Sequence, residues 1–199
     1  MLLDAEDSQL VLVDYQQRLM PAIHDGAAVI ANALRLAQAA QLLDVPSWGT
    51  EENPAGLGPL DASLTPLLGK VLPKMAFSAA QDLAPRLRPP ARGPQGNARS
   101  LPRHLQKQAA PEPGRNSIVL AGCEAHVCLL QTALELLEDE FEVWVVTDAC
   151  SSRTERNRDA AFDRLAGAGC ELVTTEMVVF EWLRSAEHPR FRQALALVK

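Results

Sequence analysis

The sequence predicts an α/β fold in which a parallel β-sheet is covered by helices on both faces. Two observations carry this prediction. Short apolar runs end abruptly at polar or turn residues, which is typical of strands buried on both faces of a parallel sheet. Segments with apolar residues at helical spacing lie between those runs, and strands that alternate with helices favour a sheet held between two helical layers.

The first half of the chain provides three of the predicted strands. Residues 9–15 form an aliphatic run that contains an acid near its end, and residues 46–49 and 70–74 are shorter candidates. Between the first two, residues 25–43 carry apolar side chains at helical spacing, which predicts a helix. The Pro- and Gly-rich residues 51–59 predict a loop before the third strand.

The second half follows the same alternation. Residues 117–122, 141–146 and 170–174 are predicted strands. The helix after the first of them presents one apolar face, made by Val127, Leu130, Leu134 and Leu137. A second helix is predicted over residues 154–168, where Gly167 or Gly169 can end it. One or two helices close the chain.

The length of 199 residues suits one domain with a substantial core. We therefore predict a single domain over residues 1–199 with a Pro/Arg-rich insertion at about 85–115. That insertion holds seven of the fourteen prolines and a single acid, Glu112, and only residues 97–109 could form a helix. Two interpretations remain open: a solvated surface excursion, or a lid or oligomer contact.

The charge and the cysteine content limit which classes of partner and which cellular compartment we expect. The net charge of -6 argues against a nucleic-acid partner. No apolar run approaches the ~20 residues that span a bilayer, and acids near the N-terminus argue against an export signal. The four cysteines show neither metal spacing nor a disulfide framework, which favours a reducing cytoplasm.

Three residues with chemical potential follow or end predicted strands. Asp14 ends the first apolar run, Lys74 ends the third strand, and Cys128 lies in the first turn of the helix after residues 117–122. Ligands of open α/β sheets bind beyond the carboxyl ends of the strands. There the helix dipole and a lysine would lower the thiol pKa, and a carboxylate could accept its proton. Each residue also has a structural interpretation: a buried apolar cysteine, an aspartate cap and a solvated lysine.

Several segments resemble the isochorismatase-like hydrolases in the same order along the chain. LVDYQ at residues 12–16, KMAFS at 74–78 and AGCEAHVC at 121–128 resemble the three catalytic segments of that family. The likeness continues through residues 147–153, 175–184 and 188–191, while residues 50–51 and 56–58 resemble the subgroup called isochorismatase domain-containing proteins. It covers nearly the whole chain except about 85–115.

The resemblance implies a three-layer α-β-α fold with a six-stranded parallel sheet and a triad of Asp14, Lys74 and Cys128. In the implied reaction Cys128 attacks a carbonyl, Asp14 handles the proton, and Lys74 stabilises the charged pair. A cis peptide is expected at Cys123–Glu124, and the backbone N–H groups of Glu124 and Cys128 would form an oxyanion hole. The retained cysteine favours a small amide or related carbonyl substrate that is cleaved through a thioester.

Two departures from the family pattern bear on this expectation. Ala125 stands where relatives often carry a threonine, which keeps open a catalytically weak or inactive member that acts as a binding or scaffold protein. Residues 51–61 contain no histidine, whereas the nicotinamidase branch places metal ligands there, so we expect no metal and no cofactor. A third alternative, a nucleotide-binding domain, is disfavoured because residues 15–18 contain no glycine to cradle phosphate.

The remaining expectations concern the substrate and the assembly. We expect a small-molecule substrate, a homo-oligomer of two or more copies, and a single low-pKa cysteine, Cys128. The candidates for the substrate-binding wall are Tyr15, Trp48, Glu51, Phe77 and His126.

Overall fold

The chain folds around one parallel sheet, which confirms the predicted fold class. A computed structural model describes residues 2–88 and 114–199. The sheet has six strands in the order β3-β2-β1-β4-β5-β6, and every neighbouring pair is parallel. The strands are β1 (Ser8–Val13), β2 (Ser47–Glu52), β3 (Lys70–Lys74), β4 (Ser117–Gly122), β5 (Glu142–Val146) and β6 (Glu171–Val173).

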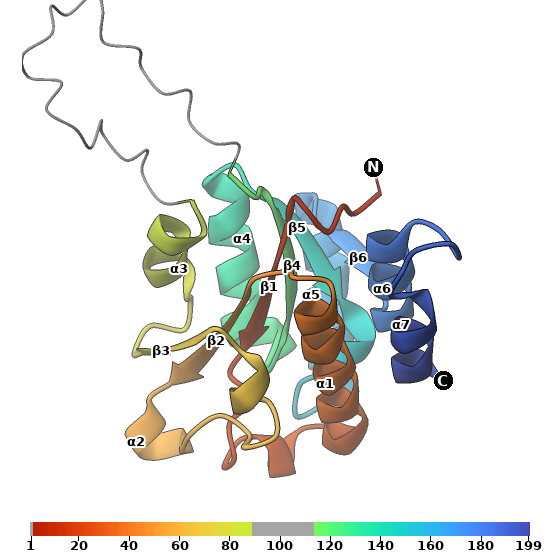
Figure 1. Cartoon of the computed structure of the whole chain (residues 1–199). Coiled ribbons are helices and arrows are strands. Elements are labelled where there is room, and N and C mark those ends of the chain that lie inside the picture. The colour runs from red at the N-terminus through yellow and green to blue at the C-terminus, as the bar shows by residue number, and fades with distance from the viewer. Residues whose placement is uncertain (1, 89–113) are drawn as a thin grey trace, which may run out of the picture.

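Helices cover both faces of the sheet (Figure 1). One layer contains α1 (Gly26–Leu42), α6 (Thr175–Leu183) and α7 (Phe191–Val198), which contact one another. The other contains α3 (Ala80–Leu87), α4 (Leu130–Glu138) and α5 (Glu155–Ala168). The shorter turns are α2 (Pro54–Leu57), η1 (Met20–Ala22), η2 (Thr65–Leu67), η6 (Thr147–Ala149) and the π-helical turn η5 (Ala125–Leu129). None of the described helices is long and apolar enough to cross a membrane.

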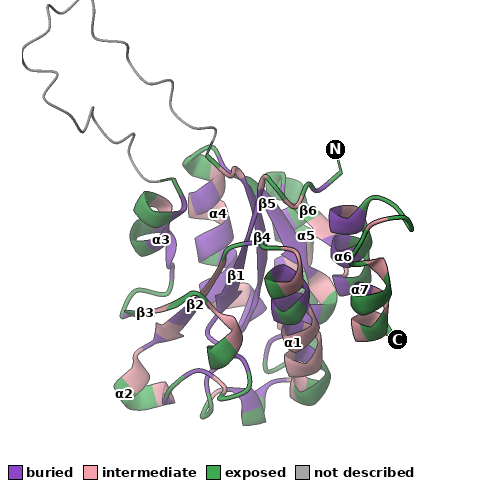
Figure 2. Cartoon of the chain, viewed as in Figure 1, coloured by how far each residue is buried: buried purple, intermediate pink, exposed green. Residues whose placement is uncertain are grey.

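The central strands are buried along their whole length. Every residue of β1 and β4 is buried, because a helical layer covers each face of these strands (Figure 2). This burial on both faces explains why the strands read as continuous apolar runs rather than as an alternation of apolar and polar residues. The few polar side chains in these strands form hydrogen bonds. For example, Ser8 Oγ accepts one from Trp182 Nε1 at 2.9 Å.

The helix predicted over residues 154–168 forms with the expected ends. Thr154 is the N-cap of α5, and its hydroxyl accepts from Asn157 N at 3.3 Å. Gly169 ends the helix with φ 103°, a left-handed conformation that glycine adopts without steric cost. Two short helices were not predicted. One is α2, inside the loop expected at residues 51–59, and the other is α3, which continues through Pro85 into the expected insertion.

The strand order reverses between β1 and β4. From this pair the chain runs outward through β2 and β3 on one side and through β5 and β6 on the other. At such a switch point the loops after two neighbouring strands diverge and leave a crevice for ligands. Gly122 makes the approach of β4 to β1 possible, because a Cβ added there would lie 2.6 Å from Val13 Cβ. Asp14 and the loop after Gly122 therefore lie side by side.

Most of the insertion predicted at 85–115, including its possible helix at 97–109, lies outside the described residues. Its described flanks, Arg88 and Arg115, are held at the amino-terminal end of the sheet. Arg88 Nη1 donates to Asp139 O at 3.1 Å, and Arg115 Nη1 donates to Ser8 O at 2.9 Å. This is the end opposite Asp14.

Candidate active site

Asp14 is the first residue after β1 and is completely buried. Its backbone is left-handed, with φ 55°, a region that aspartate tolerates better than most residues. Its carboxylate accepts two short hydrogen bonds, from Thr50 Oγ1 at 2.7 Å and from Lys74 Nζ at 2.7 Å. Because both donors come from neighbouring strands, β2 and β3, the carboxylate is fixed in position by the sheet itself.

Lys74 ends β3, and its ammonium is surrounded by acceptors. Nζ lies 2.7 Å from Asp14 Oδ2, 3.0 Å from Glu52 Oε2, 3.2 Å from Ala76 O and 2.9 Å from Phe77 O. An ammonium has three protons, so these four acceptors leave none for another partner. Burial alone would lower the pKa of Lys74, but the charge and hydrogen bond of Asp14, with smaller contributions from Cys128 and Glu52, raise it.

Cys128 lies in η5, a π-helical turn that precedes α4, rather than in the first turn of an α-helix as predicted. The residue is 6% exposed. Burial raises the pKa of Cys128 most, the charge of Asp14 and a hydrogen bond to Asp14 raise it further, and only Lys74 opposes them. The pKa of Cys128 is therefore raised in the unliganded protein, not lowered as predicted, because burial and the two carboxylates together outweigh one lysine.

The loop that joins β4 to η5 has the cis peptide bond implied by the resemblance, between Cys123 and Glu124. The Glu124 carboxylate accepts from Arg153 N at 3.0 Å and from Arg153 Nε at 2.9 Å. Ala125 N donates to Ser151 O at 2.8 Å. Over the described part of the chain, the Glu124 N–H group has no acceptor. The loop is thus held by side-chain and backbone bonds to residues 151–153 although Ala125 lacks a hydroxyl.

The arrangement of these segments agrees with comparisons to known proteins. The sequence profile of the Isochorismatase domain matches residues 8–177. The chain belongs to this family. Isochorismatase domain-containing protein 2A of Mus musculus is 34% identical over 194 residues, which cover 98% of this chain and 84% of that protein. Isochorismatase domain-containing protein 1 of Danio rerio is 35% identical, with 94% of this chain and 59% of that protein covered.

Solved structures give the same assignment. The structure of MAR1 ribonuclease from Caenorhabditis elegans has a TM-score of 0.84 and 28% identity, covering 100% of this chain and 92% of that one. The YcaC gene product of Escherichia coli, described as an octameric hydrolase of unknown specificity, has a TM-score of 0.77 and 25% identity, covering 100% and 87%. The chain is therefore a member of the isochorismatase-like hydrolase family.

Two residues predicted to line the substrate pocket of this isochorismatase domain do not do so. Tyr15 is fully buried, and its hydroxyl donates to Ala149 O, so it is a core residue whose pKa burial raises well above the usual value. Trp48 is the second residue of β2, at the amino-terminal end of the strand, where Nε1 donates to Gln9 Oε1 at 3.2 Å. It therefore lies at the end of the sheet opposite Asp14.

The side chain of Glu51, predicted to line the substrate pocket, lies on the face of β2 opposite Asp14 and Lys74, whereas its neighbour Glu52 contacts Lys74. Side chains alternate across a strand, so Thr50 and Glu52 share the face that contacts Asp14 and Lys74. Glu51 points to the other face, where Oε1 accepts from Leu60 N at 2.8 Å. The contact of Thr50 with Asp14 shows which face of β2 meets the site. Glu52 lies two residues further along the strand and therefore on the same face.

Phe77 and His126 lie near the predicted triad, but their contribution to substrate binding stays a prediction. The Phe77 carbonyl accepts from Lys74, while the residue as a whole is 54% exposed. His126 Nδ1 lies 2.9 Å from Ser152 Oγ and its Nε2 lies 3.4 Å from Asn157 Nδ2. With both ring nitrogens engaged, only the ring face of His126 is available to a ligand.

The other three cysteines are free and buried. Burial raises the pKa of Cys123 to about 12 and that of Cys170 to about 11. Burial also raises the pKa of Cys150, with a further rise from the charge of Cys123. Cys128 differs from these three because a lysine lies close enough to oppose the rise of its thiol pKa.

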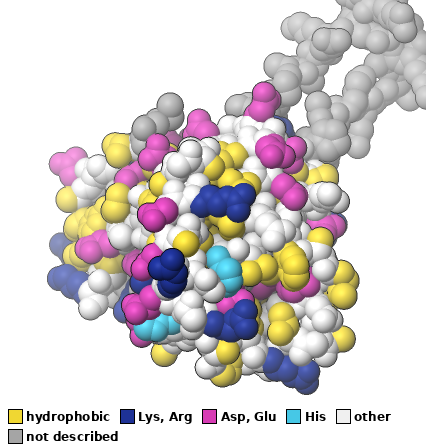
Figure 3. All heavy atoms as spheres, turned by 180° about the vertical axis from the view of Figure 1, so that it is seen from behind, with side chains coloured by type: hydrophobic (Ala, Val, Ile, Leu, Met, Phe, Trp, Pro, Cys, Tyr) yellow, Lys and Arg dark blue, Asp and Glu magenta, His cyan; other side chains and the backbone are white. Residues whose placement is uncertain are grey.

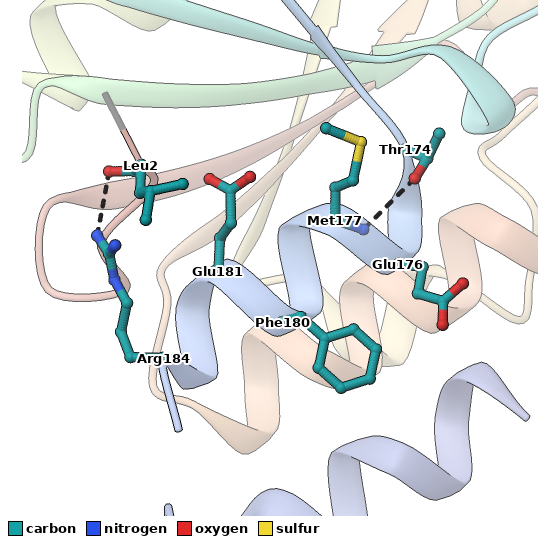
Figure 4. A pocket seen from close by; sticks show the side chains of 7 residues that line it. All are labelled: Leu2, Thr174, Glu176, Met177, Phe180, Glu181 and Arg184. Carbon is teal, nitrogen blue, oxygen red and sulfur yellow. Dashed lines mark hydrogen bonds between the residues drawn. The ribbon is translucent and has the colours of Figure 1, made fainter. Parts of the chain in front are cut away.

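A separate hollow of about 430 Å³ lies on the outer side of α6 (Figure 4). Its lining consists of Leu2, Thr174, Glu176, Met177, Phe180, Glu181 and Arg184. Arg184 Nη2 donates to Leu2 O at 3.1 Å across one side of it. None of the predicted catalytic residues borders this hollow, so it is distinct from the candidate active site.

The candidate site contains oxygen donors but no arrangement that favours a metal. Across residues 2–88 and 114–199, no group of three or more His, Cys, Asp or Glu side chains could hold a metal ion. The two nearest carboxylates, Asp14 and Glu52, share the ammonium of Lys74 instead.

Proposed function

We propose that this protein is a cysteine hydrolase that cleaves a small amide or related carbonyl compound, with Cys128 as nucleophile. The observation that supports it most is the Asp14 carboxylate, which Lys74 and Thr50 fix in position and whose charge acts on the buried Cys128 thiol. A buried cysteine with only a packing role has no need of a carboxylate and a lysine beside it. Asp14 follows β1, Lys74 ends β3, and Cys128 lies in the turn after β4, all at the carboxyl end of the sheet where ligands of such folds bind.

In the first half of the reaction Asp14 acts as general base. Because the pKa of Cys128 is raised, the thiol is protonated before substrate binds. As the sulfur attacks the carbonyl carbon, its proton moves to Asp14 and the carbonyl π electrons move to oxygen. The C–N bond then breaks, the leaving amine takes the proton from Asp14, and a thioester remains on Cys128.

In the second half a water molecule attacks the thioester. Asp14 takes a proton from the water, the C–S bond breaks, and the sulfur recovers the proton as the acid product leaves. Throughout both halves Lys74 keeps Asp14 in place and balances its charge. The backbone N–H groups of Glu124 and Cys128 are the proposed oxyanion hole, and such donors contribute about 3 kcal/mol each.

A small uncharged substrate fits the site better than RNA. The net charge of -6 opposes binding to a polyanion, and on the face seen in Figure 3 basic side chains lie scattered among acidic ones. The name ribonuclease therefore belongs to the related structure from Caenorhabditis elegans and is not carried over here. Phe77 and the ring face of His126 are the proposed walls.

The test is to incubate the protein with a panel of small amides and to look for the acyl group on the Cys128 peptide by mass spectrometry. We expect a thioester adduct, ammonia or amine release, and neither in Cys128→Ser. A matched control is Cys170→Ser, at the other end of the sheet, which should behave as wild type. No adduct and no turnover with a folded protein would favour the alternative of a binding or scaffold protein.

We also propose that the protein forms a homo-oligomer in the cytoplasm. The related YcaC protein is described as octameric, and large apolar side chains are exposed here: Leu2, Met75, Phe77, Met177 and Phe180. Monomers seldom expose several such side chains together. Light scattering coupled to size exclusion should give a mass that is a multiple of 21.6 kDa, and a monomer mass would contradict the proposal.

A further inference from the structure

The active-site lysine has a second carboxylate partner. Glu52 Oε2 lies 3.0 Å from Lys74 Nζ, and the Glu52 side chain is 11% exposed while that of Lys74 is 1% exposed. Glu52 is the last residue of β2, between the strands that carry Asp14 and Lys74. The ammonium therefore lies between two carboxylates rather than in a simple ion pair.

The backbone of Glu52 is held as firmly as its side chain. Gln16 Oε1 accepts from Glu52 N at 2.8 Å, and Gln16 Nε2 donates to Glu52 O at 2.9 Å and to Gly58 O at 2.6 Å. Gln16 is completely buried. The side-chain amide of Gln16 thus fixes both the backbone N–H and the backbone carbonyl of Glu52. The position of the Glu52 carboxylate is therefore determined before any ligand binds.

The charges in this group do not cancel. Two carboxylates and one ammonium carry a net charge of minus one when ionised (minus two plus one). Lys74 donates to Asp14, Glu52 and two backbone carbonyls, so it has no proton left to bind a substrate anion. Arg153, which follows the nucleophile loop's contact with residues 151–152, is engaged by Glu124 at 2.9 Å. Across the described residues around Cys128, negative charge prevails.

We propose that Glu52 is a positioning residue that holds Lys74 against Asp14, and that its negative charge makes Cys128 react preferentially with uncharged rather than anionic carbonyl compounds. The inference rests on the proposed role of Cys128 as the reacting thiol. An anionic substrate would bring a further negative charge into a buried group that already has an excess of one, where water screens the repulsion weakly. An uncharged amide avoids that repulsion.

The experiment compares two alkylating reagents of nearly the same size, uncharged iodoacetamide and anionic iodoacetate. Their rates of reaction with Cys128 are measured by peptide mapping in wild type, Glu52→Gln and Glu51→Gln. Glutamine can still accept from Lys74 but has no charge. Glu51→Gln is the matched control, because the adjacent side chain accepts from Leu60 N on the other face of the strand.

In Glu52→Gln we expect the ratio of the iodoacetate rate to the iodoacetamide rate to rise by about five- to tenfold over wild type. We also expect Cys128 alkylation by iodoacetamide to be faster at each pH, because a like charge near the thiol has been removed. Glu51→Gln should match wild type in both respects. A change in packing alone would alter the rates of both reagents equally and leave their ratio as in wild type.

An unchanged reagent ratio in Glu52→Gln, or an equal change in Glu51→Gln, would overturn the inference. Circular dichroism checks folding, and Glu52→Ala provides a second uncharged variant if glutamine does not fit. Alkylation requires no turnover, so the outcome is separate from that of the proposed function. A protein that shows the Glu52 effect but hydrolyses no amide would lose the proposed reaction and keep this role for Glu52.

Discussion

Lys74 Nζ lies 2.7 Å from Asp14 Oδ2, and the two side chains are 1% and 0% exposed. The ion pair joins the ends of β3 and β1, two strands that are separated by β2. Removing charges from water is costly, and apolar residues of similar volume often stabilise a fold equally well. The pair is therefore better explained by the proposed chemistry of Cys128 than by a gain in stability.

Replacement of Lys74 by methionine should destabilise the protein strongly. Asp14 and Glu52 would then be two buried or nearly buried carboxylates without a cation, and breaking one side of a buried ion pair costs about 3–5 kcal/mol. Urea unfolding measures the loss. Lys70→Met is the control, since Lys70 is exposed at the start of the same strand and should change stability by less than about 0.5 kcal/mol. Equal losses in the two variants would contradict the importance of the pair.

The reactivity of Cys128 should rise steadily with pH. A raised pKa means that the thiol is the dominant form at neutral pH, and the thiolate fraction grows about tenfold per pH unit until the pKa is reached. Alkylation by iodoacetamide should therefore increase between pH 6 and about pH 9 without levelling off. Free cysteine, whose pKa is about 8.5, serves as the reference and should begin to level off in that range.

A plateau for Cys128 below pH 7 would mean that Lys74 outweighs the two carboxylates. That result would restore the low-pKa thiol that the sequence predicts. It would also remove the need for Asp14 as the base in the attacking step.

Cys128 and Cys123 should respond differently to the same substitution. Cys128→Ser should abolish turnover, because Asp14 cannot readily remove the proton of a hydroxyl, and the fold should be unchanged. Cys123→Ser should reduce activity only modestly through the loop, since Cys123 is fully buried and lacks the lysine. Steady-state assays on the two variants, with thermal melting as the check on folding, make the comparison. An inactive Cys123→Ser beside an active Cys128→Ser would exchange their roles.

The fold could be predicted closely because its signals are local. Continuous apolar runs identified β1 and β4. Because both faces of these strands are buried, nearly every position in them requires an apolar side chain. Helix α3 escaped prediction, because eight residues that include Pro85 carry little periodic signal. The ends of α5 were predictable from Thr154 and Gly169, which have clear roles as caps.

The candidate site could be predicted only as far as single residues reveal their position. Asp14, Lys74 and Cys128 follow or end strands, so their approach to one another was foreseeable from the topology. Glu51 was predicted to line the site and Glu52 was not, because β2 has an acid on each face and its sequence does not show which face meets Lys74. The direction of the Cys128 pKa shift depends on the burial of the thiol and on the balance of three charges in space, which no local pattern contains.

The last prediction concerns Gly122, at the end of β4 where the sheet order reverses. A Cβ there would overlap Val13 O and lie 2.6 Å from Val13 Cβ, so β1 and β4 must separate to admit it. Asp14 follows Val13 directly, and Cys123 N donates to Val13 O at 3.0 Å. The substitution Gly122→Ala therefore moves the base and the nucleophile loop relative to each other. We expect a loss of about 1–3 kcal/mol in the free energy of unfolding, which is typical of overpacking, and a larger proportional loss of activity.

Gly167→Ala is the matched control for this substitution. Gly167 lies inside α5, and a Cβ there would have no heavy atom within 4 Å. Alanine in a helix is favoured over glycine by about 0.5–1 kcal/mol, so this variant should melt at the same temperature or higher and keep its activity. Thermal unfolding and the rate of Cys128 acylation are measured for both. If Gly122→Ala melts and reacts like wild type, β1 and β4 tolerate a side chain at this contact. The inference that the contact of Gly122 with Val13 positions Asp14 would then be wrong.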